Sequence, residues 1–329
     1  MASSPRGLAS LLLRPEEGPL PLEPSVVFGR KAPLAVEVGF GNGEALAWWA
    51  RRRPDWNLLG IERPPECLQR AAARLDREGL GHVRLLQGDA RVLLREVLPP
   101  ASVRKVLMQF PMPWPKERHA KHRVAGPAFA ATLAAVLEPG GHFELVTDQG
   151  WYADEAAAAL EAAGAFRILT RETDPERPFR TRYESRWLQE GRSIHRLEVE
   201  LVRPRPVQRR FLPRPMDHVF LSRMPEARLL AGLAGISFRE TDPAGVRLLG
   251  VVKEVHARLG ADGDYLLRVL AADGDFAQMF HLRLEARGEK GLLKVDGHPR
   301  PFHTPAVAFL VRALARRLEG EDPAGPRRD

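Results

Sequence analysis

The sequence predicts an α/β protein: a doubly wound, seven-stranded sheet followed by a small α+β domain. From residue 34 to residue 163, short apolar runs alternate with stretches of helical period. This alternation is typical of parallel strands covered by helices on both faces. A second observation is the proline- and arginine-rich run 203–215, which cannot continue a sheet. The chain of 329 residues is also longer than one α/β domain requires, so we expect two domains.

The first domain is predicted from its strands and helices in chain order. Leu34 to Val38 is an apolar run followed by glycines, and the stretch from Glu44 to Arg53 has helical period. The pattern then repeats, and it predicts strands at 57–61, 83–87, 103–110 and 142–147, with helices at 65–78, 91–97, 128–137 and 152–163. Two closing strands are expected, at 166–171 and around Leu197 to Leu201, and the last should be antiparallel.

Five segments are expected along the chain. They are an N-terminal segment at 1–29, the sheet domain at 30–203, a linker at 204–215, an α+β extension at 216–318 and a disordered tail at 319–329. In the extension, helices are predicted at 225–233 and 305–318, and strands at 246–255, 265–270, 276–285 and 291–295. Asp-Gly and Gly-Glu-Lys turns join these strands.

The composition indicates a partner with negative charge. The chain has 50 lysines and arginines against 42 acidic residues, a formal charge of +8 and a pI near 10.1, which favours nucleic acid. The excess is mostly arginine, so a coding bias is an alternative explanation. The single cysteine, Cys67, excludes an intrachain disulfide framework and a cysteine-rich zinc site. No run reaches the roughly 18 apolar residues of a membrane span, so we expect a cytoplasmic protein.

Candidate ligand-binding residues follow each of the first three strands. After the first, Gly39 and Gly41 leave the backbone open to a ligand beside the next helix. Their spacing differs from the dinucleotide fingerprint. The second strand ends at Glu62, placed to accept hydrogen bonds from a ribose, and the third at Asp89 and Ala90, placed to contact an adenine edge. The alternatives are a solvated Glu62 and an Asp89 that only caps a helix.

A proline-rigid loop with a basic end follows the fourth strand. It has the sequence FPMPWPK from Phe110 to Lys116 and leads into a basic cluster. Open α/β sheets bind ligands at this end of their strands. Trp114 is equally suited to stacking on a base and to packing the loop. The candidate phosphate contacts are Lys116, Arg118, Lys121 and Arg123, and a solvated charged face is the alternative.

A glycine turn, an acid after the second strand and an acid after the third strand indicate an adenosine cofactor without phosphates, S-adenosylmethionine. Residues from about 30 to 203 resemble the bacterial tRNA (guanine-N7-)-methyltransferase family. The motifs are EVGFGNGE at 37–44, GIE at 60–62, GDA at 88–90, FPMPWPK at 110–116 with His119, Lys121 and Arg123, TD at 147–148, and TRYE at 181–184. The resemblance implies a Rossmann-like class I methyltransferase sheet and methylation of guanine N7 at position 46 of the tRNA variable loop.

The resemblance also implies roles for individual residues. Cofactor contacts are expected from Glu37, Gly39, Gly41, Glu62, Asp89 and Ala90. Substrate contacts are expected from Lys116, Arg118, Lys121, Arg123, Asp148, Thr181, Arg182, Tyr183 and Glu184. The implied partner is tRNA, no metal is expected, and the choice between monomer and homodimer stays open.

One position departs from the family pattern. Between the first two prolines of the loop the family normally has an acid that is treated as catalytic, and this chain has Met112. Guanine N7 has an in-plane lone pair and no proton, so methyl transfer needs no general base. Alignment of two reactants alone is worth on the order of 7 to 11 kcal/mol. We therefore expect activity to be retained, with Asp148 or Glu184 binding the guanine edge in place of the missing acid.

Two other classes of function are considered. The first is a tRNA-binding protein that keeps the methyltransferase scaffold but has lost or altered catalysis because of Met112. The second is a methyltransferase that acts on a small molecule or a protein, which the basic loop disfavours. A steep dependence of binding on salt concentration distinguishes an RNA-directed protein from the latter.

Overall fold

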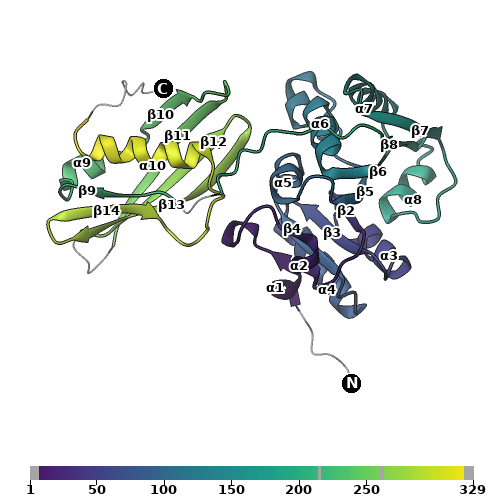
Figure 1. Cartoon of the computed structure of the whole chain (residues 1–329), viewed down its shortest axis with the longest axis horizontal. Helices are drawn as coiled ribbons and strands as arrows, with labels where there is room; N and C mark the ends of the chain where they lie inside the picture. The colour runs from purple at the N-terminus through teal and green to yellow at the C-terminus, as the bar shows by residue number, and fades with distance from the viewer. Residues whose placement is uncertain (1–6, 214–215, 259–262, 322–329) are drawn as a thin grey trace. The chain divides into compact units, whose positions relative to one another are not determined.

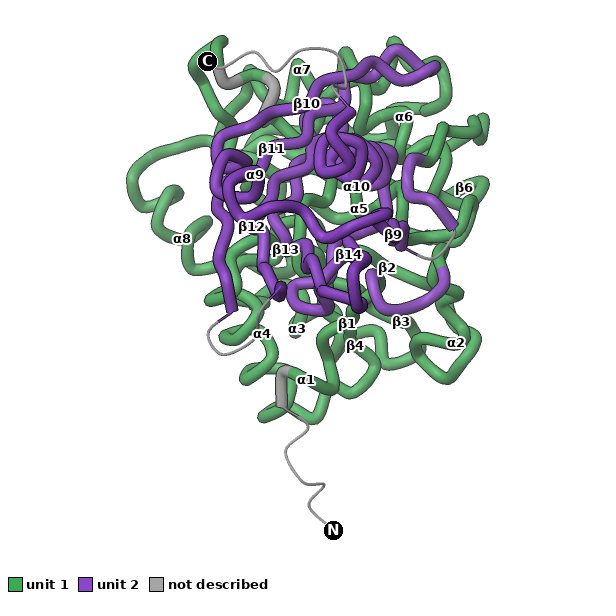
Figure 2. Tube along the Cα trace, turned by 90° about the vertical axis from the view of Figure 1, so that its left-hand side faces the viewer, with its two compact units in different colours: residues 1–15, 20–209 green, residues 16–19, 210–329 purple. Residues whose placement is uncertain are grey.

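The computed structural model describes residues 7–213, 216–258 and 263–321 (Figure 1). The chain divides into two compact units, which Figure 2 shows in different colours. Unit 1 consists of residues 1–15 and 20–209, and unit 2 of residues 16–19 and 210–329. In the C-terminal tail, residues 322–329 lie outside the described residues, so the predicted disorder there stays a prediction.

Two consecutive arginines mark the division between the units. The guanidinium of Arg209 donates a hydrogen bond to the backbone carbonyl of Leu98, inside unit 1. The guanidinium of Arg210 donates to Asp242 at 2.7 Å and to Asp273 at 3.2 Å, inside unit 2. Each side chain is therefore held within its own unit.

Unit 1 contains a mixed eight-stranded sheet. Its strands are β1 (Leu12–Leu13), β2 (Leu34–Val38), β3 (Asn57–Glu62), β4 (Val83–Gln87), β5 (Val103–Gln109), β6 (Leu137–Thr147), β7 (Phe166–Thr173) and β8 (His195–Leu201). They lie in the order β1-β4-β3-β2-β5-β6-β8-β7. All neighbouring pairs are parallel except those of β8, which is antiparallel to both β6 and β7. The predicted α/β class and the antiparallel last strand are confirmed.

The number of strands differs from the prediction of seven. The additional strand, β1, is only two residues long, and Leu12 and Leu13 pair in parallel with Leu85 and Leu86 of β4. So short a strand has no periodicity that the sequence could reveal. It pairs with backbone groups of β4 that would otherwise form an open sheet edge.

Helices pack against this sheet in two groups. The bounds are α1 (Gly7–Leu11), α2 (Pro24–Phe28), α3 (Glu44–Arg52), α4 (Pro65–Arg77), α5 (Ala90–Val97), α6 (Pro127–Val136), α7 (Gly150–Ala162) and α8 (Arg182–Gln189), with a short 3-10 helix at Glu117–His122. Another 3-10 helix, Pro15–Glu17, includes residues assigned to both units. Helix α4 contacts α1 and α3, and α6 contacts α5 and α7. Among the described residues, none of the helices has both the length and the apolar character needed to cross a membrane.

Unit 2 is a curled antiparallel sheet with one long helix. Its strands are β9 (His218–Leu221), β10 (Ser237–Thr241), β11 (Arg247–Ala257), β12 (Tyr265–Asp273), β13 (Phe276–Arg287) and β14 (Lys290–Val295), in the order β10-β11-β12-β13-β14-β9. The helices are α9 (Ala227–Ala231) and α10 (Pro305–Leu318). Gly250 of β11 lets α10 approach closely, because a Cβ there would lie 2.7 Å from Leu310. The predicted α+β class is confirmed, while β9 and β10 were not predicted.

Candidate cofactor and substrate pocket

A pocket of about 520 Å³ opens where the parallel strands of unit 1 end. Its walls come from the turn after β2, the start of α3, the loop after β5, the turn after β6, and α8 with the residues that follow it. The predicted site residues that line it are Glu37, Gly39, Gly41, Met112, Asp148, Thr181 and Tyr183. The pocket thus combines residues that are up to about 150 positions apart in the chain.

The glycine turn after β2 forms the floor beside the start of α3. Gly39, Gly41 and Gly43 all have positive φ, at 74°, 54° and 71°, which glycine adopts without strain. The backbone N–H of Gly41 donates to a carboxylate oxygen of Glu62 at 2.8 Å. Gly43 is the N-cap of α3, and a Cβ at this position would lie 2.8 Å from the Cβ of Ala71. The turn is therefore fixed by glycine conformation, by Glu62 and by close packing on α4.

This packing predicts different costs for two glycine substitutions. Gly43→Ala should lower the free energy of unfolding of unit 1 by about 2 to 4 kcal/mol, from left-handed strain and overpacking. Gly41→Ala is the matched control, because no atom lies within 4 Å of an added Cβ; we expect about 1 to 2 kcal/mol from strain alone. Urea unfolding followed by tryptophan fluorescence measures both, and equal losses would contradict the packing argument.

Glu37 lies at the inner end of the pocket. Its side chain is 3% exposed, and its Oε2 atom has no hydrogen-bond partner among the described residues. Burial, with a smaller contribution from the charge of Glu62, raises the pKa of the Glu37 carboxyl to about 8. A buried carboxyl group with an unpaired oxygen is suited to receive a positively charged or hydrogen-bond-donating ligand.

Glu62 and Asp89 lie outside the pocket lining and have partners of their own. Glu62 accepts hydrogen bonds from the backbone N–H groups of Gly41 and Arg63, each at 2.8 Å. Asp89 caps α5 by accepting from the backbone N–H of Arg91 at 3.0 Å, and it pairs with the Arg91 guanidinium at 2.6 Å. Burial raises the pKa of the Asp89 carboxyl, but Arg91 outweighs it and holds that pKa below its usual range. The helix-cap alternative for Asp89 is therefore present, and Ala90 begins the capped helix.

The proline loop after β5 is held in an unusual backbone conformation. Phe110 and Trp114 have positive φ, at 51° and 48°, which is uncommon for bulky residues. Met112 is 66% exposed and lines the pocket, so no carboxylate occupies the place of the family's acid. Trp114 is 36% exposed. The loop therefore presents an apolar thioether to the pocket.

The basic residues after this loop differ in accessibility. Lys116 and Arg118 are exposed, and the side chain of Lys121 lies outside the described part of the structure. Arg123 is only 8% exposed, donates to Glu155 at 2.9 Å, and lies over the ring of Trp151 at 4.9 Å. Arg123 thus packs inward and is poorly placed for a phosphate contact.

Asp148 follows β6 and lies in the pocket wall. Its carboxylate accepts from the guanidinium of Arg192 at 2.9 Å and from the side-chain amide of Gln149 at 2.8 Å. Arg192 also lies over the ring of Trp187, 5.9 Å from its centroid. Asp148 is therefore held in one orientation, with its partner Arg192 in the same pocket.

The TRYE motif forms the start of α8. Thr181 is the N-cap, and Thr181 and Glu184 form a reciprocal capping box. Glu184 is 1% exposed and pairs with Arg177 at 2.5 Å, while the same guanidinium donates to Gln109 at 2.7 Å. Glu184 therefore fixes α8 to the end of β5 and does not line the pocket, whereas Tyr183 lines it and is 60% exposed.

Arg182 joins the two sides of the pocket. Its side chain and backbone N–H donate to Glu44, at 2.7 Å and 3.2 Å. Glu44 begins α3, next to the glycine turn. Burial raises the pKa of Glu44, but hydrogen bonds and charge from Arg182 outweigh it and lower that pKa below its usual range. Arg182 therefore ties the start of α8 to the start of α3, beside the glycine turn.

Four residues of this site were not predicted from the sequence. Trp187 stands against Phe110, with ring centroids 4.8 Å apart, and against Tyr183 at 6.1 Å. The others are Arg177, Arg192 and Gln109. The spacing Thr-x-x-Glu at 181–184 is a helix-start signal that predicts α8, and with it the position of Trp187 one turn after Tyr183. Nothing local in the sequence predicts the partners of the two arginines.

Comparison with known proteins decides the family. A family model described as a putative methyltransferase matches residues 31–197. The tRNA (guanine-N(7)-)-methyltransferase of Thermotoga maritima is 37% identical over 312 residues, which cover 94% of this chain and 97% of that protein. The chain belongs to this methyltransferase family. The predicted resemblance is confirmed.

The similarity within the family extends beyond the predicted range of 30–203. The protein of the same name from Thermus thermophilus is 34% identical over 305 residues, 91% of this chain and 93% of that protein. The one from Nitrosococcus oceani is 39% identical over 174 residues, which cover 53% of this chain and 74% of that protein. A solved S-adenosylmethionine-dependent methyltransferase from Aquifex aeolicus, 18% identical, has a TM-score of 0.38 and covers 55% of this chain and 91% of that chain. The first two relatives therefore share sequence with unit 2 as well.

The predicted cofactor, S-adenosylmethionine, agrees with membership of this methyltransferase family. The residues fit such a cofactor, because the unpaired Oε2 of Glu37 faces a pocket beside the open glycine turn. A positively charged cofactor there would meet a carboxyl group and the backbone of Gly39 and Gly41. In the described ranges, no group of three or more His, Cys, Asp and Glu side chains is arranged to hold a metal ion.

Proposed function

We propose that this chain methylates N7 of guanine 46 in the variable loop of tRNA. The observation that carries the proposal is the match over 94% of the chain to a protein named tRNA (guanine-N(7)-)-methyltransferase. The pocket supports the proposal. Its lining includes the carboxyl group of Glu37 for a cofactor, and the rings of Tyr183 and Trp187 with the carboxylate of Asp148 for a base. As a tRNA-modifying enzyme, the protein would act in the cytoplasm, where its substrate is.

The side chains divide into a cofactor side and a base side. Glu37 and the glycine turn would hold the cofactor, which would supply the methyl group. Guanine N7 would form the new bond to that carbon with its lone pair, and the electrons of the broken bond would stay on sulfur. Tyr183 and Trp187 provide flat faces against which a guanine ring can stack. Asp148, oriented by Arg192, accepts hydrogen bonds from the N1 and N2 donors of the base. N7 carries no proton, so no residue needs to act as a base.

Met112 is compatible with these roles for the cofactor side and the base side of the pocket. The family's acid is replaced by a thioether at the pocket edge, and Asp148 is the carboxylate on the base side of the pocket. Glu184 pairs with Arg177 inside the protein, whereas Asp148 lines the pocket; of the two candidates we therefore propose Asp148 for the guanine edge. We propose Lys116 and Arg118, both exposed, as contacts to the tRNA backbone, and Arg182 as a brace between α8 and α3.

Transfer of labelled methyl groups to unmodified tRNA tests the function. The parent should label guanine 46, as mapped by cleavage at N7-methylguanine, and tRNA with 7-deazaguanine at that position should stay unlabelled because it lacks the nucleophilic nitrogen. Asp148→Asn should lower kcat/KM about 10- to 100-fold, since a hydrogen bond to a charged group contributes about 1.5 to 3 kcal/mol. Lys116→Ala should raise KM for tRNA.

The variant Met112→Asp distinguishes an active enzyme from a tRNA-binding protein that has the methyltransferase fold but no methyl transfer activity. If Asp148 binds the guanine edge, the parent is active, and Met112→Asp changes kcat/KM less than Asp148→Asn does. An inactive parent that gains methyl transfer through Met112→Asp would establish the alternative, a tRNA-binding protein that lost its chemistry.

A further inference from the structure

The sheet of unit 2 has one face that its helices leave uncovered. Helix α10 contacts β9, β11, β12 and β14 on one face of the sheet, and Figure 1 shows it lying across the strands. The buried residues Val269, Leu282 and Leu293 belong to that inner face and to the core cluster. Side chains alternate between faces along a strand, so their neighbours form an outer face. Among the described residues, unit 2 places no helix on it.

A row of basic side chains crosses this outer face. The strand register pairs His256 of β11 with Leu266, Leu266 with Arg283 of β13, Arg283 with Lys294 of β14, and Lys294 with His218 of β9. At about 4.8 Å between strands, these five strands span roughly 19 Å. We call His218, Lys294, Arg283 and His256 the basic row.

The cations around the basic row outnumber the carboxylates that hold them. Glu285 is contacted by Arg283 at 3.2 Å, Arg287 at 2.7 Å and Lys294 at 2.8 Å. Asp264 is contacted by Arg258 at 3.2 Å and again by Arg283 at 2.9 Å. The same face also carries a Glu254–Arg268 pair at 3.0 Å, the cation Lys290 and the acid Asp296. Six cations thus face four acids, before the histidines are counted.

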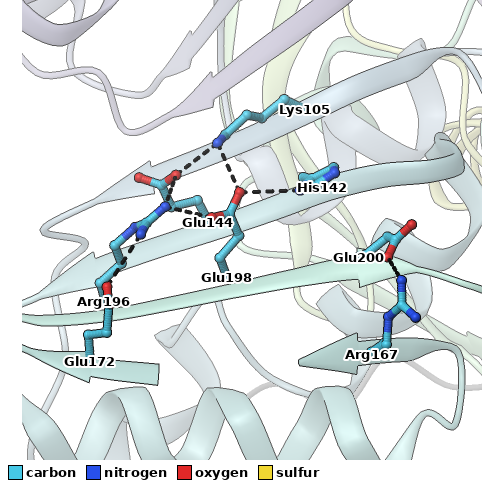
Figure 3. Close-up of polar contacts among 8 residues, drawn as sticks. All are labelled: Lys105, His142, Glu144, Arg167, Glu172, Arg196, Glu198 and Glu200. Carbon is cyan, nitrogen blue, oxygen red and sulfur yellow. Dashed lines mark hydrogen bonds and ion pairs between the residues drawn. The ribbon is translucent and has the colours of Figure 1, made fainter. Parts of the chain in front are cut away.

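A charged sheet face in unit 1 has the opposite balance. On β5, β6, β7 and β8, the cations Lys105 and Arg196 and the imidazole of His142 share three carboxylates, and Arg167 pairs with Glu200 (Figure 3). The three carboxylates are Glu144, Glu172 and Glu198. Lys105 and Arg196 are only 15% and 26% exposed. The cations drawn on this face do not outnumber its carboxylates, so charge distinguishes the two faces.

The outer face of unit 2 also has a hollow and one exposed aromatic ring. A hollow of about 420 Å³ is lined by His256, Arg258 and Arg283 and by the acids Asp264 and Asp296, among others. At the other edge Phe220 of β9 is 62% exposed. Guanidinium groups bind phosphate oxygens through two parallel hydrogen bonds, and aromatic rings stack on bases. A positive row with an exposed aromatic ring at one edge therefore matches the chemistry of an RNA strand.

We propose that the outer face of unit 2 is a second tRNA-binding surface, with Arg258, Arg283 and Lys294 as phosphate contacts. The proposal rests on tRNA being the substrate of the pocket in unit 1. It assigns unit 2 a part in substrate binding that is independent of the methyl transfer step.

The test compares two variants that lose the same charge. The first replaces Arg258, Arg283 and Lys294 by glutamine; the control replaces Arg51, Arg104 and Arg167, which are exposed and ion-paired in unit 1. Binding of unmodified tRNA is titrated at several salt concentrations, and cofactor affinity is measured by calorimetry. We expect the first variant to bind tRNA at least about 10-fold more weakly. The slope of log binding constant against log salt concentration should also become shallower by about 2, at roughly 0.7 for each lost phosphate contact. Its cofactor affinity and the control's tRNA binding should be unchanged.

Other outcomes overturn the proposal in distinguishable ways. Equal losses in both variants would show that only net charge matters, and unchanged binding in the first variant would exclude the surface. Weakened binding of polyglutamate but not of tRNA would assign the face to an acidic protein instead. Misfolding is excluded as the cause if the first variant has the same melting temperature as the parent. It is also excluded if a variant with Arg283→Lys in place of the glutamine recovers binding. A parent that binds tRNA without methylating it contradicts the proposed function but leaves this test intact.

Discussion

In the cofactor-free protein, replacing Glu37 by glutamine should remove a large dependence of stability on pH. The Glu37 carboxyl has a pKa of about 8 in the folded chain, against 4.5 as its ordinary value. Between these two pH values the folded state keeps a proton that the unfolded state has lost. Stability from this group is therefore fully present below pH 4.5 and is lost as the pH rises to about 8. The difference between the two pKa values corresponds to a change in the free energy of unfolding of at most about 5 kcal/mol.

The measurement uses the location of the tryptophans. All six lie between Trp48 and Trp187, so their fluorescence reports on unit 1. Urea unfolding of the parent and of Glu37→Gln at several pH values should give a difference in unfolding free energy that falls steadily from about pH 4.5 to 8. Glu161→Gln, an exposed carboxylate on α7, controls for the loss of one ionisable group. A difference that does not change with pH would show that Glu37 is ionised in the folded state.

Cofactor binding gives a second readout of the same carboxyl group. A positive charge next to Glu37 lowers its pKa, so binding near pH 7 should release up to one proton. Calorimetry in buffers of different ionisation enthalpy counts the protons released. Glu37→Gln should release fewer, and equal release from both proteins would place the titrating group elsewhere.

Breaking the Arg177–Glu184 pair should have the second large effect. The two side chains are 9% and 1% exposed, and removing one partner leaves the other as a buried, uncompensated charge. Arg177→Met should lower the free energy of unfolding of unit 1 by about 3 to 5 kcal/mol. At about 2 to 4 °C for each kcal/mol, this is a fall of roughly 10 °C in Tm. Since α8 carries Tyr183 and Trp187, KM for tRNA should also rise.

A double variant separates charge burial from packing. Glutamine at position 184 keeps the capping box without a charge, so Arg177→Met with Glu184→Gln should be more stable than Arg177→Met alone. Arg186→Met is the control on the same helix: its pair with Glu190 is exposed, and it should change stability by less than about 1 kcal/mol. If the double variant is less stable than Arg177→Met, the loss comes from packing and not from a stranded charge.

Much of unit 1 was predictable because its signals are local. Strand β2 has the predicted bounds of 34–38, and β3 and β4 agree within one residue, because buried parallel strands are short apolar runs between turns. The glycine turn was predicted for the same reason: positive φ at Gly39 and Gly41 restricts which residue fits. The Thr181–Glu184 capping box was an equally local signal that the prediction did not use.

The sequence by itself determined the α/β class, the family and the edge of the sheet where the pocket lies, since each depends on residues close together in the chain. Only the tertiary structure decided that Glu184 turns inward to Arg177, that Arg192 holds Asp148, and that Trp187 faces Phe110. The segment containing α8 connects β7 to β8, and its position depends on strand pairing across the sheet. The same holds for the basic row of unit 2, whose members come from four strands. Neither arrangement follows from local periodicity, because pairing between distant strands sets which side chains meet.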